Sequence, residues 1–81
     1  MGDTTFDVLI ATMDRVVYEG KAKSLILQGE KGVFEVLPYH KKLISRLTKG
    51  SLNLDGQHFP ITRGVAKVSP TDVTVIVEEA R

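Results

Sequence analysis

Residues 59–78 read FPITRGVAKVSPTDVTVIVE, and this stretch decides the fold class. It contains two short runs in which apolar, often β-branched residues alternate with other residues, and a Ser-Pro-Thr-Asp segment separates them. Proline fixes φ at the first central position of a turn, so Pro70 predicts a tight connection. Alternation with a period of two on both sides of a turn is typical of neighbouring antiparallel strands.

The rest of the chain repeats this design, and no window keeps apolar residues at helical spacing over three turns. Asp55-Gly56 predicts a two-residue hairpin, because a type I′ turn needs positive φ at both central positions. Lys49-Gly50 and the segment from Gly29 to Gly32 predict further turns. Strands are predicted at Thr5–Thr12, Arg15–Lys23, Ser24–Gln28, Val33–Leu37, Lys42–Leu47, Ser51–Leu54, Gln57–Thr62, Val65–Ser69 and Val73–Glu78.

These runs predict an all-β fold: a two-sheet antiparallel β-sandwich, or flattened barrel, of about ten short strands in a single domain over residues 1–81. The predicted inner face is Phe6, Val8, Ile10, Leu25, Leu27, Phe34, Val36, Leu52, Leu54, Phe59, Ile61, Ala66, Val68, Val73, Val75 and Val77. On the opposite parity, apolar residues stand where an isolated sandwich would be polar: Leu9, Ala11, Ile26, Val33, Leu37, Val65 and Ile76. A contiguous patch of them would mark a partner surface, whereas scattered apolar surface residues are normal.

Composition describes an ordinary globular domain, with 42% hydrophobic residues, 26% charged residues and a net charge of +1. The chain has no cysteine, so neither a disulfide nor a thiolate metal site can supplement its core. A domain of 81 residues buries a modest share of its surface, so a bound neighbour would help to stabilise it. We expect neither a secretory leader nor a membrane-spanning segment, and membrane association only through a partner.

Patterns that would indicate catalysis or metal binding are missing from the sequence. The spacing of its two histidines, His40 and His58, predicts no convergence with carboxylates, so we expect no metal site. No serine lies in a G-x-S-x-G context, and the glycines at 29 and 32 are not followed by the Gly-Lys-Ser/Thr of a phosphate-binding loop. We therefore expect no catalytic residue, no cofactor and no small-molecule ligand.

The segment 40–50 is basic, because it carries Lys41, Lys42, Arg46 and Lys49 without an acidic residue. It fits a solvated face, a surface for an acidic stretch of a partner protein, or a site for single-stranded nucleic acid. Nucleic-acid sites usually add aromatic residues on which bases stack, and only Tyr39 and Phe34 lie nearby in the sequence. A small basic β-domain that binds single-stranded nucleic acid is thus the alternative function, and a protein partner is favoured over nucleic acid.

The chain also resembles the β-sandwich domain of the epsilon subunit of F-type rotary ATP synthases, over about residues 6–78. The family pattern is an acidic loop bounded by glycines, a short apolar strand followed by proline and histidine, and later an apolar strand closed by Ser/Gln-Pro and Val-Thr-Val. The chain keeps the matching residues in order and spacing: Gly29, Gly32, Pro38, His40, Gly64, Val68, Pro70 and Val73-Thr74-Val75.

The resemblance implies a non-catalytic subunit of the central stalk of a proton-transporting ATP synthase, peripheral on the cytoplasmic side of the cell inner membrane. Its partners would be the gamma subunit and the membrane rotor ring, called the c-ring, and it would couple ion flow to ATP synthesis. The implied gamma-binding residues are Thr12, Tyr39, His40, Leu43 and Ser45. The implied c-ring-binding residues are Glu30, Lys31, Gly32, Val33 and Glu35.

Several positions depart from the family pattern. Family members usually carry glycine at the positions of Glu35 and Tyr39, proline near Lys42 and an acidic residue at the position of Val33. Tyrosine tolerates positive φ less readily than glycine, so we expect the backbone of loop 38–42 to differ. Many members continue into a two-helix hairpin that inhibits ATP hydrolysis, whereas this sequence ends at Arg81, either as a naturally short form or as part of a longer chain. For a naturally short form we expect coupling without that inhibition.

Overall fold

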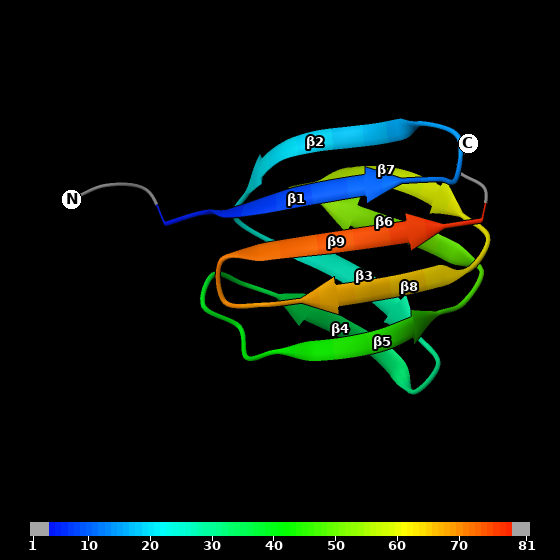
Figure 1. The fold of residues 1–81 in the computed structure, drawn as a ribbon. Helices are drawn as coiled ribbons and strands as arrows, with labels where there is room; N and C mark the ends of the chain where they lie inside the picture. Colours follow the sequence, from blue (N-terminus) through cyan, green and yellow to red (C-terminus); the bar gives the residue numbers. More distant parts are fainter. Residues whose placement is uncertain (1–3, 79–81) are drawn as a thin grey trace.

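A computed structural model describes residues 4–78, and in this range it contains nine β-strands and no helix (Figure 1). Accordingly, the described residues include no helix long and apolar enough to cross a membrane. Each predicted strand is present, and its ends lie within one residue of the predicted ends. The strands are β1 (Phe6–Ala11), β2 (Val16–Ala22), β3 (Leu25–Gly29), β4 (Gly32–Val36), β5 (Leu43–Leu47), β6 (Gly50–Leu54), β7 (Gln57–Ile61), β8 (Gly64–Val68) and β9 (Asp72–Val77).

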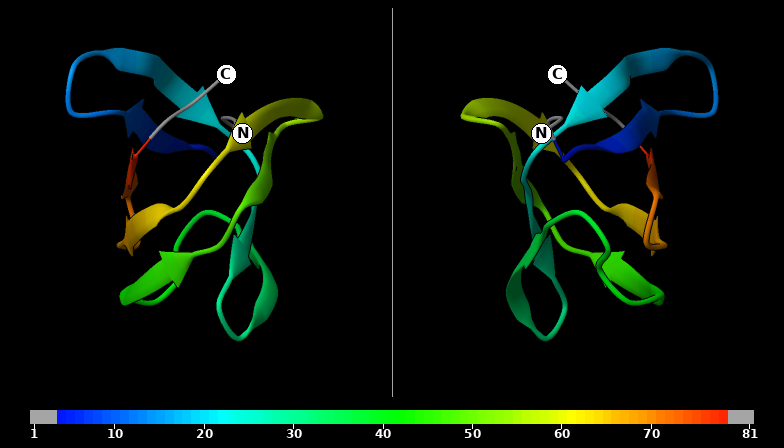
Figure 2. Two further views of the ribbon diagram at one scale, coloured as in Figure 1. Left: turned by 90° about the vertical axis from the view of Figure 1, so that its right-hand side faces the viewer. Right: turned by 90° about the vertical axis from the view of Figure 1, so that its left-hand side faces the viewer.

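The strands form one strongly curled sheet in the order β2-β1-β9-β8-β5-β3-β6-β7, and β4 pairs with β3 beside this path. The sheet folds over where Gly29 of β3 pairs with Leu47 of β5. This corner separates a layer of β2, β1, β9, β8 and β5 from a layer of β4, β3, β6 and β7, and the end-on views show the two layers facing each other (Figure 2). The predicted all-β sandwich is confirmed.

One strand pair departs from the predicted antiparallel arrangement. β1 and β9 run parallel, with Val8 beside Val73 and Ile10 beside Val75. The other strand pairs of the described chain are antiparallel. A hairpin turn fixes the relative direction only of strands that follow one another in the sequence. Because β1 and β9 are the first and last strands, no turn signal could predict the direction of this pair.

Apolar side chains fill the space between the two layers, and the predicted inner face supplies most of them. Leu27, for example, is fully buried, and burying such a side chain stabilises the fold by about 1.5–3 kcal/mol. Phe34 and Phe59 were predicted to be core residues but are only half-buried, because they lie toward the two open sides of the sandwich. Ala22 and Leu47 belong to the core although the alternation did not indicate them.

The expected outer-face residues divide into three groups. Val33, Leu37, Val65 and Ile76 are exposed, and Leu9 and Ile26 are half-buried. Ala11 shares the outer face with its neighbour Ile76 of β9, yet it is buried, with 8% of its surface exposed, and it does not belong to the core cluster. The register of β1 against β2 shifts between Ile10 and Ala11. The extra residue of this shift is Val17 of β2, while β1 keeps its regular register against β9.

The predicted turn at Asp55-Gly56 is confirmed, because its two residues have φ values of 48° and 90°. The Asp55 carboxylate also accepts hydrogen bonds from the backbone N–H groups of Lys23, at 3.1 Å, and Ser24, at 2.9 Å. These contacts fasten the β6–β7 turn to the link between β2 and β3. A single side chain thus joins two connections that lie far apart in the sequence.

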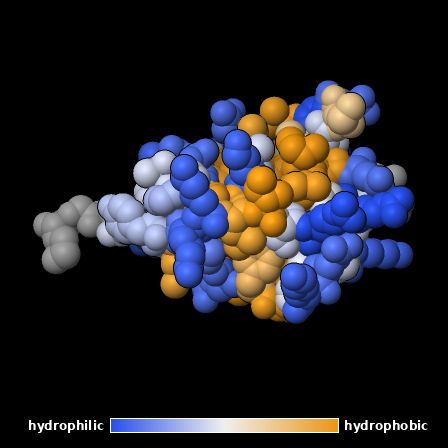
Figure 3. Space-filling model, turned by 60° about the horizontal axis from the view of Figure 1, so that its bottom comes forward, coloured by the Kyte–Doolittle hydropathy of each residue, from blue (hydrophilic) through white to orange (hydrophobic). Residues whose placement is uncertain are grey.

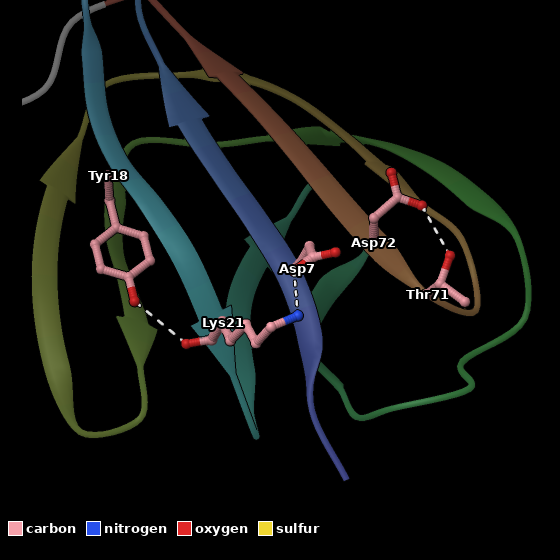
Figure 4. Close-up of polar contacts among 5 residues, drawn as sticks. All are labelled: Asp7, Tyr18, Lys21, Thr71 and Asp72. Carbon is pink, nitrogen blue, oxygen red and sulfur yellow. Dashed lines mark hydrogen bonds and ion pairs between the residues drawn. The ribbon is translucent and has the colours of Figure 1, made fainter.

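Side chains also close the gap between the edge strands β2 and β7. The rings of Tyr18 and Phe59 pack edge to face, with centroids 6.1 Å apart. The Tyr18 hydroxyl donates to the backbone oxygen of Lys21 at 3.2 Å, and the Lys21 ammonium lies 2.8 Å from the Asp7 carboxylate (Figure 4). Both charged side chains are exposed, so their pair adds little stability, and it is the ring contact that joins the layers here.

Candidate functional site

A cleft lies between β4 and β5, the two strands at the bottom of Figure 1. It has a volume of about 440 Å³. Half-buried Phe34 lines one side and half-buried Leu43 and Ser45 line the other. Gly29 forms the closed end of the cleft, and a Cβ there would lie 3.0 Å from Ser45 Oγ and 3.1 Å from a Phe34 ring carbon. Glycine at this position therefore permits the close approach of the two walls.

The hairpin tip at the end of this cleft presents the implied c-ring residues to solvent. Glu30, Lys31, Gly32, Val33 and Glu35 are all exposed, and the first four also line the cleft. The tip is nevertheless firmly anchored. The Glu30 N–H donates to the Arg46 carbonyl at 3.1 Å, and the Thr48 N–H donates to the Gln28 carbonyl at 2.9 Å. These bonds join the β3–β4 hairpin to β5, so the exposed tip extends from a cross-linked base.

The loop between β4 and β5 carries Tyr39 and His40. Tyr39 has a φ of 66°, a left-handed conformation that glycine favours, and its side chain is 75% exposed. Its N–H donates to the Pro70 carbonyl at 2.9 Å, which holds this loop against the turn between β8 and β9. The His40 ring Nδ1 lies 2.7 Å from the Lys41 carbonyl oxygen, so the proton sits on Nδ1 when this bond forms.

The implied gamma-binding residues do not form one compact cluster. Leu43 and Ser45 lie in the cleft. Tyr39 and His40 lie in the loop that precedes β5. Thr12 follows the last residue of β1, at the opposite end of the sandwich. The Thr12 hydroxyl accepts hydrogen bonds at 3.2 Å from the backbone N–H groups of Asp14 and Arg15, so it shapes its own loop. A surface that includes all five residues must run along the whole length of β5.

A second surface is the outer face of the layer that contains β8 and β9. Val65 and Ile76 are direct neighbours there, 44% and 41% exposed, and Ile44 on β5 is 71% exposed. Hydrophobic side chains gather in the middle of the face that the space-filling view presents, between hydrophilic rims (Figure 3). The sequence did not single out Ile44, because Leu43-Ile44 is apolar on both parities and only the structure decides which residue points outward.

A shallow cavity of about 400 Å³ borders this apolar face, and Met13, Val65 and Ile76 contribute to its lining. Arg63 and Glu78 stand at its rim, where Arg63 Nε donates to the Glu78 carboxylate at 2.9 Å. This hydrogen bond, together with the charge of Glu78, raises the pKa of Arg63 above its ordinary value. Because arginine is already charged at any physiological pH, the shift gives this cavity no acid–base chemistry.

Polar groups of the described chain do not converge on a reactive centre. Among residues 4–78, no group of three or more His, Asp or Glu side chains could hold a metal ion. The hydroxyls of Ser24 and Ser45 donate to Glu35 Oε2 at 2.7 Å and to the Arg46 carbonyl at 3.1 Å. The basic residues of segment 40–50 are exposed but spread from one end of β5 to the other. This arrangement fits protein docking better than a compact nucleic-acid groove.

The sequence matches the family model of the ATP synthase delta/epsilon chain β-sandwich domain over residues 5–81. The chain therefore belongs to this family, and the predicted family is confirmed.

Named relatives agree with this assignment. The chain is 31% identical to the ATP synthase epsilon chain of Bordetella parapertussis, with 94% of this chain and 58% of the relative covered. It is 32% identical to the epsilon chain of Xanthomonas oryzae pv. oryzae, with coverages of 88% and 54%. The chain thus spans little more than half the length of these relatives.

Solved structures show the same fold. A chain of the Euglena gracilis mitochondrial ATP synthase, solved with its OSCP, F1 and c-ring, superposes with a TM-score of 0.89 at 19% identity; the match covers 98% of this chain and 54% of that one. A chain of the central stalk and c-ring of the Tetrahymena thermophila enzyme gives a TM-score of 0.79 at 11% identity, with coverages of 94% and 65%. At these identities the likeness concerns the fold.

Proposed function

We propose that the protein is a non-catalytic rotor subunit in the central stalk of a proton-transporting ATP synthase. In this role it docks the gamma subunit onto the c-ring and couples ion flow to ATP synthesis. It reaches the cytoplasmic side of the inner membrane only as part of the complex. Membership of the delta/epsilon family supports this proposal, as does the likeness of fold to chains of two ATP synthases.

The observation that carries the proposal is the anchored hairpin tip. Torque transmission requires a contact that does not yield under load, and an exposed loop is usually the most mobile part of a small domain. Here the tip at Glu30-Lys31 continues directly into β3 and β4, and the Glu30 N–H is bonded to β5. A load on the tip therefore passes into both layers through backbone hydrogen bonds. We assign the c-ring contact to Glu30, Lys31, Gly32, Val33 and Glu35.

The gamma contact is assigned to Tyr39, His40, Leu43 and Ser45, which border the β5 side of the molecule, and to Thr12, which follows β1. Exposed aromatic residues are favoured anchors at protein interfaces, and Tyr39 is 75% exposed. Leu43 is half-buried at the mouth of the cleft, so an incoming apolar side chain could cover its remaining surface. The neighbouring basic residues would add attraction to an acidic stretch on the partner.

A binding titration with purified gamma subunit and purified c-ring tests both assignments. Tyr39→Ala combined with Leu43→Glu should weaken gamma binding at least about tenfold, because it removes an aromatic anchor and places a charge in an apolar contact. Glu30→Lys combined with Lys31→Glu should weaken c-ring binding and leave gamma binding unchanged. Lys67→Glu, an exposed charge reversal on the outer face of β8, is the matched control. Unchanged affinity of the first variant for gamma would remove Tyr39 and Leu43 from the site.

Salt dependence separates this function from nucleic-acid binding. Phosphate contacts release counterions, so the affinity of a nucleic-acid-binding domain falls steeply as salt increases. Gamma docking through apolar and aromatic residues should change much less between about 50 and 200 mM salt. Tight, salt-sensitive binding to single-stranded oligonucleotides together with no binding to gamma or the c-ring would overturn the proposed function.

A further inference from the structure

The outer edge of β4 is an unprotected strand edge. In the part of the chain that the structure describes, β4 pairs with β3 alone. The edge strand β7 carries Pro60, which cannot donate to a new ladder, and Tyr18 of the edge strand β2 packs on Phe59. β4 reads GVFEV and contains neither proline nor lysine. An edge of this kind is a template for pairing with another strand.

The backbone of β4 has free groups on this edge. Only Glu30 and Lys31 separate Gly29 from Gly32, so these two paired residues exchange both of their backbone hydrogen bonds. Hydrogen-bonded and non-hydrogen-bonded pairs alternate along an antiparallel ladder. The N–H and C=O groups of Val33 and Glu35 therefore point away from β3. Both residues are exposed, Val33 to 67%.

We propose that this edge binds a second copy of the same chain, with the two β4 strands antiparallel about a two-fold axis at Val33. In this register Val33 faces its own counterpart, and Lys31 of each copy lies opposite Glu35 of the other. Opposite charges and β-branched residues that face one another are favourable cross-strand pairs. A two-fold interface repeats each contact, so two Lys–Glu pairs flank one central valine pair.

In the same register, the side chains on the inner side of the two β4 strands also fit one another. Phe34 of one copy lies opposite Gly32 of the other, and no heavy atom lies within 4 Å of the position that a Cβ on Gly32 would take. This open space can accept an aromatic ring. The two copies also place their layers on the same sides of the new ladder, so they cover the half-buried Phe34 and Leu43 at the mouth of the cleft.

Neighbouring registers lose these contacts. An axis at Phe34 places Val33 opposite Glu35, and an axis at Glu35 brings two carboxylates together, which is unfavourable. The charge pattern of residues 31–35 thus selects one register. The paired strands have five residues each, so the interface is small and the association is expected to be weak.

Sedimentation equilibrium of the 81-residue chain between about 10 µM and 1 mM tests the proposal, together with variants that reverse one charge. Lys31→Glu alone and Glu35→Lys alone each turn both attractive pairs into repulsive ones, so each should weaken the dimer at least about tenfold. An equimolar mixture of the two variants should form a heterodimer, because each glutamate of one variant then faces a lysine of the other at both pairs. The double variant Lys31→Glu/Glu35→Lys should recover self-association. Lys67→Glu, which reverses a charge away from β4, should dimerise like the parent chain.

The charge-reversed pair keeps the test independent of folding defects, because a misfolded variant could not regain association when mixed with its counterpart. A parent chain that stays monomeric up to about 1 mM would overturn the proposal, since even a weak edge contact should be populated there. So would a dimer whose affinity does not change in the single variants. The assay contains no other subunit, so its result is independent of the proposed function. Because dimerisation and the proposed c-ring contact use the same hairpin, the two associations exclude each other.

Discussion

Gly64 is the position at which the addition of a single methyl group should lower the stability of the fold most. It begins β8 and pairs with Leu47 of β5 on one side and with Val77 of β9 on the other. A Cβ at this position would lie 2.1 Å from the carbonyl oxygen of Ile76 and 2.8 Å from the Cα of Val77. Both are backbone atoms, so no side-chain rotation can relieve the overlap in Gly64→Ala, and the first part of β8 must move away from β9 by about 1 Å.

The expected loss follows from that displacement. Introducing an extra carbon into a closely packed site costs about 1–3 kcal/mol. A displaced β8 also weakens its first backbone hydrogen bonds, each of which contributes about 1 kcal/mol. The free energy of unfolding should therefore fall by about 3–4 kcal/mol, a large share of the stability of a domain this small. In a domain of this size the melting temperature should fall by about 12–32 °C.

Thermal and urea unfolding, followed by circular dichroism, measure this loss, and Gly20→Ala provides the matched control. A Cβ at Gly20 would lie 2.8 Å from the Tyr18 hydroxyl, the far end of a flexible side chain that can turn aside. Gly20→Ala should therefore change the free energy of unfolding by less than about 1 kcal/mol. A Gly64→Ala variant within about 1 kcal/mol of the parent, or equal losses in both variants, would refute the argument from backbone contact.

Three further predictions concern stability and are measured by urea unfolding. At Tyr39, where φ is 66°, a Tyr39→Gly variant should be more stable than Tyr39→Val by about 1 kcal/mol or more, because a β-branched residue tolerates this conformation least; equal stabilities would contradict the strain. Asp55→Ala should lower the free energy of unfolding by about 1 kcal/mol, because it leaves the N–H of Ser24 without an acceptor, and Asp55→Asn, which keeps one acceptor, should lower it less. A larger loss of stability in the asparagine variant would count against this role. Leu27→Ala should lower the free energy of unfolding by about 2–5 kcal/mol, because the Leu27 side chain is fully buried. Ile44→Ala, at a residue that is 71% exposed, should lower it by less than about 0.5 kcal/mol, and comparable losses in the two variants would place Ile44 in the core.

The fold was predictable where one local signal acts alone. Asp55-Gly56 determines its own turn, because few other residue pairs adopt positive φ at both positions. Alternation located the strands and most of the core for a similar reason, since one face of each strand must be buried. Sequence could not predict the extra residue Val17 in the pairing of β2 with β1, or the parallel pairing of β1 with β9. The first has no local residue signal, and the second joins segments that no turn connects.

The candidate site, like the fold, has features that the sequence predicted and features that it could not predict. Two closely spaced glycines predicted an exposed turn at Glu30-Lys31, and the structure places both residues in solvent. Sequence could not predict that Thr12 and Tyr39 lie at opposite ends of the sandwich, because this depends on the direction in which each strand crosses it. Nor did it predict that Tyr39 would adopt the left-handed conformation of a glycine, which the bond from its N–H to the Pro70 carbonyl holds in place.

A rigid coupling element needs its exposed contacts close to the backbone hydrogen bonds that carry load, and the corner between β3 and β5 supplies this arrangement. From Gly29 the ladder continues through Leu47 into β5, then into β8 and β9, and finally through the parallel pair into β1. The β3–β4 hairpin is thus the end of one continuous ladder that crosses both layers. The same position at the end of the ladder leaves the outer edge of β4 unpaired. The feature that suits the hairpin to the proposed docking role in the rotor therefore also makes it the edge at which we propose that two free copies meet.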